Sequence, residues 1–135
     1  MLKLHLEIGK AKNKTPSGKI VMNGETIHDG PYINDTCELA PIIGHNVLEV
    51  SLNNKTDRDT RLDGNKIVED VFVVIKDIKC SVTNDSAGHL DTIGRYQTDK
   101  GENLLTYGYL SYNGTYTFKF DYPFFVFARN KAFYQ

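Results

Sequence analysis

The strongest constraint on the fold is a strict two-residue alternation of apolar and polar side chains at the start of the chain. Four aliphatic residues alternate with three polar ones in the order Leu2, Lys3, Leu4, His5, Leu6, Glu7 and Ile8. A period of two places the aliphatic side chains on one face of a β-strand. The same alternation marks residues 48–52 and 116–120, whereas 71–75 is apolar on both faces, as in a covered interior strand. These segments predict a fold built from strands.

Two Asn-Gly dipeptides stand between runs of β-forming residues. Asn23-Gly24 separates residues 19–22 from 25–28, and Asn113-Gly114 lies between two runs rich in Tyr and Phe. Asn-Gly is the strongest short-range signal for a two-residue hairpin turn, because both residues tolerate positive φ. The sequence therefore predicts one β-hairpin at each dipeptide.

No segment shows sustained helical periodicity, and turn residues recur at short intervals. Together with the alternating segments, this predicts an all-β fold, an antiparallel β-sandwich or jelly roll. The 135 residues are enough for one domain with its own core and too few for two ordinary ones, so we expect a single domain over residues 1–135. Residues 10–18 and 53–65 are polar and are predicted as loops.

The charge balance and hydropathy argue against two classes of partner. The chain has 16 Lys and Arg against 17 Asp and Glu, a net charge of -1, which gives no long-range attraction to nucleic acid or anionic lipid. Its mean hydropathy is -0.40, and no apolar run is long enough to span a membrane. Neither a nucleic acid nor a membrane is expected as a partner.

Cys37 and Cys80 are interpreted as small core residues, with a single disulfide as the alternative.

The sequence carries no recognisable catalytic signature. Its four histidines are scattered, and none stands in a metalloprotease or nucleophile pattern. Closely spaced carboxylates occur, but no spacing singles out a catalytic pair. The chain is therefore predicted not to be an enzyme.

The polar segment 53–65 and the residues after it could supply oxygen ligands to Ca²⁺. The carboxylates available for such a site are Asp57, Asp59, Asp63 and Asp70. The spacing is not that of an EF-hand, since Val68 stands where a bidentate Glu would be needed. Lys55, Arg58 and Arg61 also neutralise much of the negative charge. We therefore expect no cofactor here and favour a solvated loop, with calcium as the alternative.

Aromatic residues are the remaining signal, with eight Tyr, seven Phe and no Trp. Exposed Tyr side chains can stack on sugar rings or anchor a protein interface, although core packing is the commoner role. The candidates for sugar stacking are Tyr107, Tyr109 and Tyr112.

The C-terminal segment 122–135 is rich in aromatic residues on both faces of a terminal strand. Covering all of them needs more apolar surface than one small sandwich offers, so we expect a homo-oligomeric or other protein interface there. The candidate interface residues are Tyr122, Phe125, Phe127, Phe133 and Tyr134.

Several segments of the chain resemble two known groups of proteins. These segments are 44–54, which begins Gly44-His45-Asn46, then 57–60 and 68–78, and finally 113–118 and 122–124. The middle third resembles calcium-dependent xylan-binding carbohydrate modules. Most of the chain is similar to small virion proteins of tailed bacteriophages, which end in a comparable Gly-aromatic hairpin and aromatic-Pro-aromatic strand.

The resemblance implies a carbohydrate-binding-module-like sandwich and two possible functions. The first is a non-enzymatic structural protein of the bacteriophage virion, in the tail, a fibre attachment or the capsid surface, that contacts other virion proteins. The alternative is a module that binds host or plant polysaccharide, with or without calcium. Where the carbohydrate modules have Asn-Asp, this chain has Asn54-Lys55, which replaces a metal-binding carboxylate with an ammonium group. That departure argues against calcium, because Lys55 would repel the ion.

Overall fold

The computed structural model describes residues 2–10, 14–33, 36–56, 61–63, 66–80, 94–104, 109–110 and 112–122. These residues form β-strands and turns, in two main antiparallel sheets and one small one. The four-stranded sheet has the order β11 (Tyr109–Leu110), β8 (Phe72–Cys80), β1 (Leu2–Gly9) and β4 (Thr36–Leu39). The six-stranded sheet has the order β10 (Asn103–Leu104), β9 (Gly94–Thr98), β12 (Gly114–Tyr122), β5 (Gly44–Leu52), β2 (Ser17–Met22) and β3 (Glu25–Pro31). The predicted all-β fold is confirmed.

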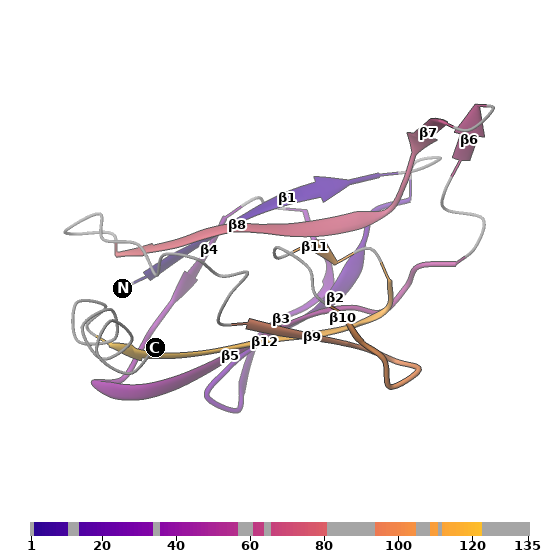
Figure 1. Ribbon diagram of the computed structural model, residues 1–135. Coiled ribbons are helices and arrows are strands. Elements are labelled where there is room, and N and C mark those ends of the chain that lie inside the picture. Colours follow the sequence, from indigo (N-terminus) through magenta and orange to yellow (C-terminus); the bar gives the residue numbers. More distant parts are fainter. Residues whose placement is uncertain are drawn as a thin grey trace.

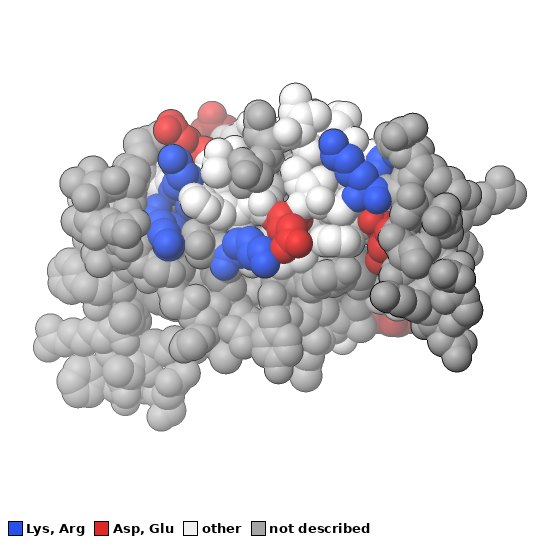
Figure 2. Space-filling model, turned by 90° about the horizontal axis from the view of Figure 1, so that it is seen from above, with Lys and Arg blue, Asp and Glu red and all other residues white. Residues whose placement is uncertain are grey.

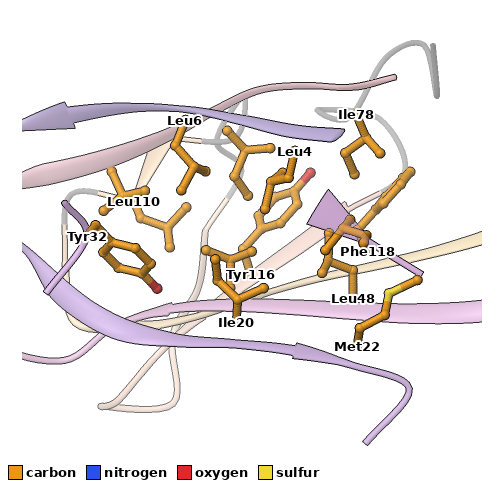
Figure 3. Packing of buried hydrophobic residues seen from close by; sticks show 14 of the residues in the cluster. Leu4, Leu6, Ile20, Met22, Tyr32, Leu48, Ile78, Leu110, Tyr116 and Phe118 are labelled. Atoms are coloured by element: carbon orange, nitrogen blue, oxygen red, sulfur yellow. The ribbon is translucent and has the colours of Figure 1, made fainter. Parts of the chain in front are cut away.

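The two sheets lie face to face, with the four-stranded sheet above the six-stranded one in Figure 1. Side chains from both sheets point into the space between them, as Figure 3 shows for Leu4 and Ile78 from one sheet and Ile20, Leu48 and Phe118 from the other. One cluster of buried apolar residues therefore joins the sheets, which makes the fold an antiparallel β-sandwich. Among the residues that the structure describes, no helix is long and apolar enough to cross a membrane.

Strand β1 follows the predicted alternation. Leu2, Leu4 and Leu6 are buried, whereas Lys3 and Glu7 are exposed. A shift in the pairing of β1 with β8 occurs between His5 and Leu6, and the alternation of side chains relative to the core continues across it.

Strand β8 and the residue before it also meet the prediction. Val71, Val73 and Ile75 are 0%, 0% and 3% exposed. The alternate residues Phe72 and Val74 are half-buried on the other face of the sheet. The apolar character of both faces therefore reflects a buried inner face and a partly covered outer face.

The first predicted hairpin is confirmed. Asn23 and Gly24 connect β2 to β3 with φ values of 52° and 82°, as a turn of this type requires. The Asn23 backbone N–H donates to the Val47 carbonyl at 2.9 Å, and its side-chain oxygen accepts from the Val47 N–H at 2.8 Å. The hairpin turn is thus fastened to strand β5.

The second predicted hairpin is wrong. Strand β11 pairs with β8 in the four-stranded sheet, whereas β12 pairs with β5 and β9 in the six-stranded sheet. Residues around Asn113-Gly114 therefore cross from one sheet to the other. Gly114 is needed here for a close approach and not for positive φ, because a Cβ atom on it would lie 2.3 Å from the Gln97 carbonyl oxygen.

The segment predicted as a loop over 53–65 is partly ordered into strand. Strands β6 (Arg61–Asp63) and β7 (Lys66–Glu69) form a small antiparallel sheet, which projects from one end of the sandwich in Figure 1. Cys37 is a free, half-buried thiol that packs against the core. Cys80 lies in β8, and its side chain falls outside the described part of the structure.

The outer face of the four-stranded sheet carries charges of both signs. Figure 2 shows Lys and Arg side chains interspersed with Asp and Glu and separated by uncharged residues. One pair on this face joins Lys76 Nζ and a Glu7 carboxylate oxygen at 2.7 Å, with both side chains more than half exposed. The described residues of this face offer no continuous basic surface.

The buried position of Val73 gives a test of the sandwich. Replacing Val73 by Ala should lower the free energy of unfolding by about 1–3 kcal/mol, because it removes buried methyl groups and leaves a cavity. The control is Val74→Ala on the same strand, where a half-buried side chain should cost less than half as much. Chemical denaturation monitored by circular dichroism measures both. Equal losses would contradict the assigned orientation of β8.

Candidate functional site

The segment that crosses between the sheets brings an aromatic side chain to the surface. Tyr112 is 61% exposed, and it is the one exposed Tyr or Phe among those whose side chains the structure describes. It lies between β11 and β12, close to the end of β5 and to Lys55. The surroundings of Tyr112 are therefore a candidate binding site.

The backbone of Tyr112 is held from the protein interior by Tyr96. The Tyr96 side chain is 1% exposed, in the centre of strand β9. Its hydroxyl donates to the Tyr112 carbonyl and accepts from the Tyr112 N–H at 3.1 Å. Burial raises the pKa of Tyr96 to about 12, so the hydroxyl stays protonated and able to donate at a higher pH than an ordinary Tyr hydroxyl does.

The next residue, Asn113, fastens the crossing segment to the chain after β5. Its side-chain oxygen accepts from the Lys55 N–H, and its amide group donates to the Lys55 carbonyl, both at 2.8 Å. Its own carbonyl accepts from the Asp99 N–H at 2.9 Å. Tyr112 is thus bonded to Tyr96 in the core, and Asn113 is bonded to Lys55 and Asp99, although neither Tyr112 nor Asn113 belongs to a strand.

Lys55 carries its charge into the same site. Its Nζ lies 2.7 Å from an Asp70 carboxylate oxygen, and both side chains are only 12% exposed. The same Nζ lies 5.8 Å from the centroid of the Tyr112 ring, within the range of a cation–π interaction. Lys55, Asp70 and Tyr112 therefore form one cluster, which we call the Tyr112 site.

Asn54 has a structural role beside this site. Its side-chain oxygen accepts from the Ser17 N–H at 2.8 Å, and its amide group donates to the Thr15 carbonyl at 2.9 Å. The amide thus ties the start of β2 to the end of β5. A metal ion or ligand could bind the Asn54 side chain only if these hydrogen bonds were broken.

The Tyr112 site combines three kinds of group that suit a polyhydroxylated ligand. The ring offers a flat apolar surface, the Lys55 ammonium offers hydrogen-bond donors, and the Asp70 carboxylate offers acceptors. Within the described ranges, no group of three or more His, Cys, Asp or Glu residues is arranged to hold a metal ion.

The structure separates the predicted site residues. Of the three stacking candidates, Tyr112 is exposed at the site, Tyr109 lies in β11 with its side chain outside the described part, and Tyr107 lies outside it altogether. Of the possible calcium ligands, Asp70 is paired with Lys55, and the side chain of Asp63 in β6 is not among those described. The other two, Asp57 and Asp59, lie outside the described residues.

Most of the predicted interface residues lie outside the described part of the structure. Tyr122 ends β12, where it is half-buried and packs against the core. Phe125, Phe127, Phe133 and Tyr134 lie outside the described residues, so the predicted interface stays a prediction.

Sequence reasoning missed the parts played by Tyr96 and Asn113. The sequence around Asn113 predicts only a turn, and nothing local distinguishes Tyr96 from the other tyrosines. Tyr96 and Tyr112 are 16 positions apart and Asn113 and Lys55 are 58 positions apart, so no local pattern connects either pair.

Comparison with known proteins identifies the type of fold. A scan against protein-family models and a search of curated proteins found no match. A search of solved structures found similarity to "vCBM60 in complex with galactobiose", a carbohydrate-binding module. The two are 11% identical, the match covers 87% of this chain and 95% of that chain, and the TM-score is 0.50. This similarity shows a β-sandwich like that of a carbohydrate-binding module.

The burial of the Lys55–Asp70 pair predicts a measurable effect on stability. Asp70→Ala should lower the free energy of unfolding by about 1–3 kcal/mol, since it leaves an ammonium group largely buried without this carboxylate. The control is Glu7→Ala, which breaks an ion pair of the same length that is half exposed and should cost about 0–1 kcal/mol. Thermal and urea denaturation measure both variants, and equal losses would contradict a special role for the buried pair.

Proposed function

We propose that this protein is a non-catalytic carbohydrate-binding module that binds a polysaccharide at the Tyr112 site. The observation that carries the proposal is an exposed aromatic ring whose backbone is fixed by Tyr96 and Asn113, with a charged pair beside it. A backbone that is already fixed needs no ordering when a ligand binds, so less of the binding energy is lost.

Each group of the site has a defined part in this binding. The Tyr112 ring packs against the apolar C–H face of a sugar ring. Lys55 donates hydrogen bonds to sugar hydroxyls, and Asp70 accepts them, with the strength that ionised groups give to such bonds. The pair stays neutral as a whole, which suits a neutral sugar.

The fold comparison supports the class of ligand. The similar solved structure is a carbohydrate-binding module in complex with galactobiose. At 11% identity, this similarity supports the binding of a glycan but does not identify which sugar is bound. The function of a protein depends on its site and not on a shared fold alone, so experiment must identify the sugar.

The expected virion role has less support. Nothing in the comparisons links this chain to bacteriophage proteins. The expected homo-oligomer and virion contacts depended on the C-terminal aromatic residues, most of which lie outside the described structure. Carbohydrate binding is therefore the function that we propose.

The proposed binding makes Tyr112 its most sensitive residue. The purified chain is titrated with galactobiose and with galactose- and xylose-containing oligosaccharides by calorimetry. Tyr112→Ala should weaken binding about tenfold, which corresponds to roughly 1.4 kcal/mol of lost ring contact.

The matched control is Ile43→Ala, which also removes an exposed apolar side chain. Ile43 is 87% exposed and precedes Gly44, which pairs with the far end of β12. The two ends of this nine-residue strand are about 26 Å apart. Binding should be unchanged in this variant, and equal loss in both variants would contradict the assigned site.

We also propose that binding needs no calcium. A Ca²⁺ ion on Asp70 would meet the Lys55 ammonium 2.7 Å from the same carboxylate, and the like charges would repel. Melting temperature and glycan affinity should therefore be the same with Ca²⁺ and with a chelator. A clear rise of the melting temperature with Ca²⁺ would overturn this, because ligand binding to the folded state raises stability.

A further inference from the structure

We infer that Tyr96 is a positioning residue of the Tyr112 site: its buried hydroxyl sets the backbone of Tyr112 so that the ring is ready to receive a sugar. This inference rests on the proposed function. Tyr96 itself is 1% exposed and cannot touch a ligand at the surface. It acts through Tyr112.

The hydrogen bonds of Tyr96 are directed at one residue. Its hydroxyl donates to the Tyr112 carbonyl and accepts from the Tyr112 N–H at 3.1 Å. One hydroxyl thus engages both polar groups of the Tyr112 backbone. Two bonds from a side chain in the rigid core fix the direction in which the Tyr112 side chain leaves the backbone.

Tyr112 needs such a support because it lies in neither sheet. Strand β11 ends at Leu110 and β12 begins at Gly114, so no strand ladder includes Tyr112. Asn113 fixes the following residue to the Lys55 backbone. Tyr96 and Asn113 together hold the backbone of residues 112 and 113 beside that of Lys55, whose ammonium lies 5.8 Å from the centroid of the Tyr112 ring.

The hydroxyl of Tyr96 is not needed to fill the core. Strand β12, next to β9, places Phe118 and Phe120 in the same core at 1% and 0% exposure, so a plain phenyl ring suits this environment. A Phe at position 96 would keep the apolar packing and lose only the bonds to Tyr112. Replacing Tyr96 by Phe therefore isolates the positioning effect.

Tyr32 provides a matched control. It is also 1% exposed, and its hydroxyl also donates to backbone carbonyls, those of Ser51 at 2.5 Å and Lys19 at 3.2 Å. Those carbonyls belong to β5 and β2, which already pair with each other. Tyr32→Phe thus removes a buried hydroxyl of the same kind without touching Tyr112.

The test measures two properties of Tyr96→Phe and Tyr32→Phe, well below the melting temperature of either variant. Amide hydrogen exchange at Tyr112 should be at least about fivefold faster in Tyr96→Phe and unchanged in Tyr32→Phe. Affinity for the oligosaccharide that the wild-type chain binds should fall about three- to tenfold in Tyr96→Phe and stay within about twofold in Tyr32→Phe. Melting temperatures should fall by similar amounts in both.

The outcomes separate this inference from the proposed function. If Tyr112→Ala loses binding while Tyr96→Phe binds as the wild type does, the positioning role is wrong and the binding site stands. If both Phe variants lose affinity equally, Tyr96 acts through general stability and the inference is again wrong. If the wild type binds none of the oligosaccharides, or if Tyr112→Ala binds normally, the proposed function and this inference fail together.

Discussion

The structure depends on the backbone pairing of strand β12. All nine residues of β12 pair with β5, and five of them also pair with β9, so this strand joins the two halves of the six-stranded sheet. Its inward side chains Tyr116, Phe118 and Phe120 are at most 2% exposed and belong to one buried cluster with aliphatic residues from the opposite sheet. The first residue of this strand directly follows the crossing segment. The position of the Tyr112 site is thus set by where β12 begins.

The crossing of the chain between the two sheets is what places the Tyr112 site at the surface. A connection between two sheets must leave one ladder before it enters the next, and its backbone groups need other partners. The Tyr96 hydroxyl supplies these partners for Tyr112, and the Asp99 N–H supplies one for the Asn113 carbonyl. The Asn113 side chain in turn bonds to the Lys55 backbone. The same bonds that satisfy the Tyr112 backbone also fix the point from which its side chain extends to the surface. Lys55 and Asp70 complete the site as a nearly buried pair.

Much of the sandwich could be predicted from the sequence because strand periodicity is local. The alternation in β1 and β5, the buried residues of β8 and the turn at Asn23-Gly24 are all visible within a few residues. The error at Asn113-Gly114 has a physical cause: the dipeptide suits a tight turn, but the partner that fixes Asn113 is Lys55, 58 residues away. The sequence named Tyr112 as a stacking candidate without separating it from Tyr107 and Tyr109. Its exposure follows from the crossing between sheets, which no local pattern shows.

The central claim is that a sugar contacts Tyr112 and the Lys55–Asp70 pair, and chemical-shift mapping by NMR during titration with galactobiose tests it most directly. The account predicts that the largest shifts occur at Lys55, Asp70, Tyr112 and Asn113, with shifts of the Tyr112 ring protons that indicate stacking. Shifts centred instead on the outer face of the six-stranded sheet or on the exposed loop at Ile42 and Ile43 would contradict the assigned site.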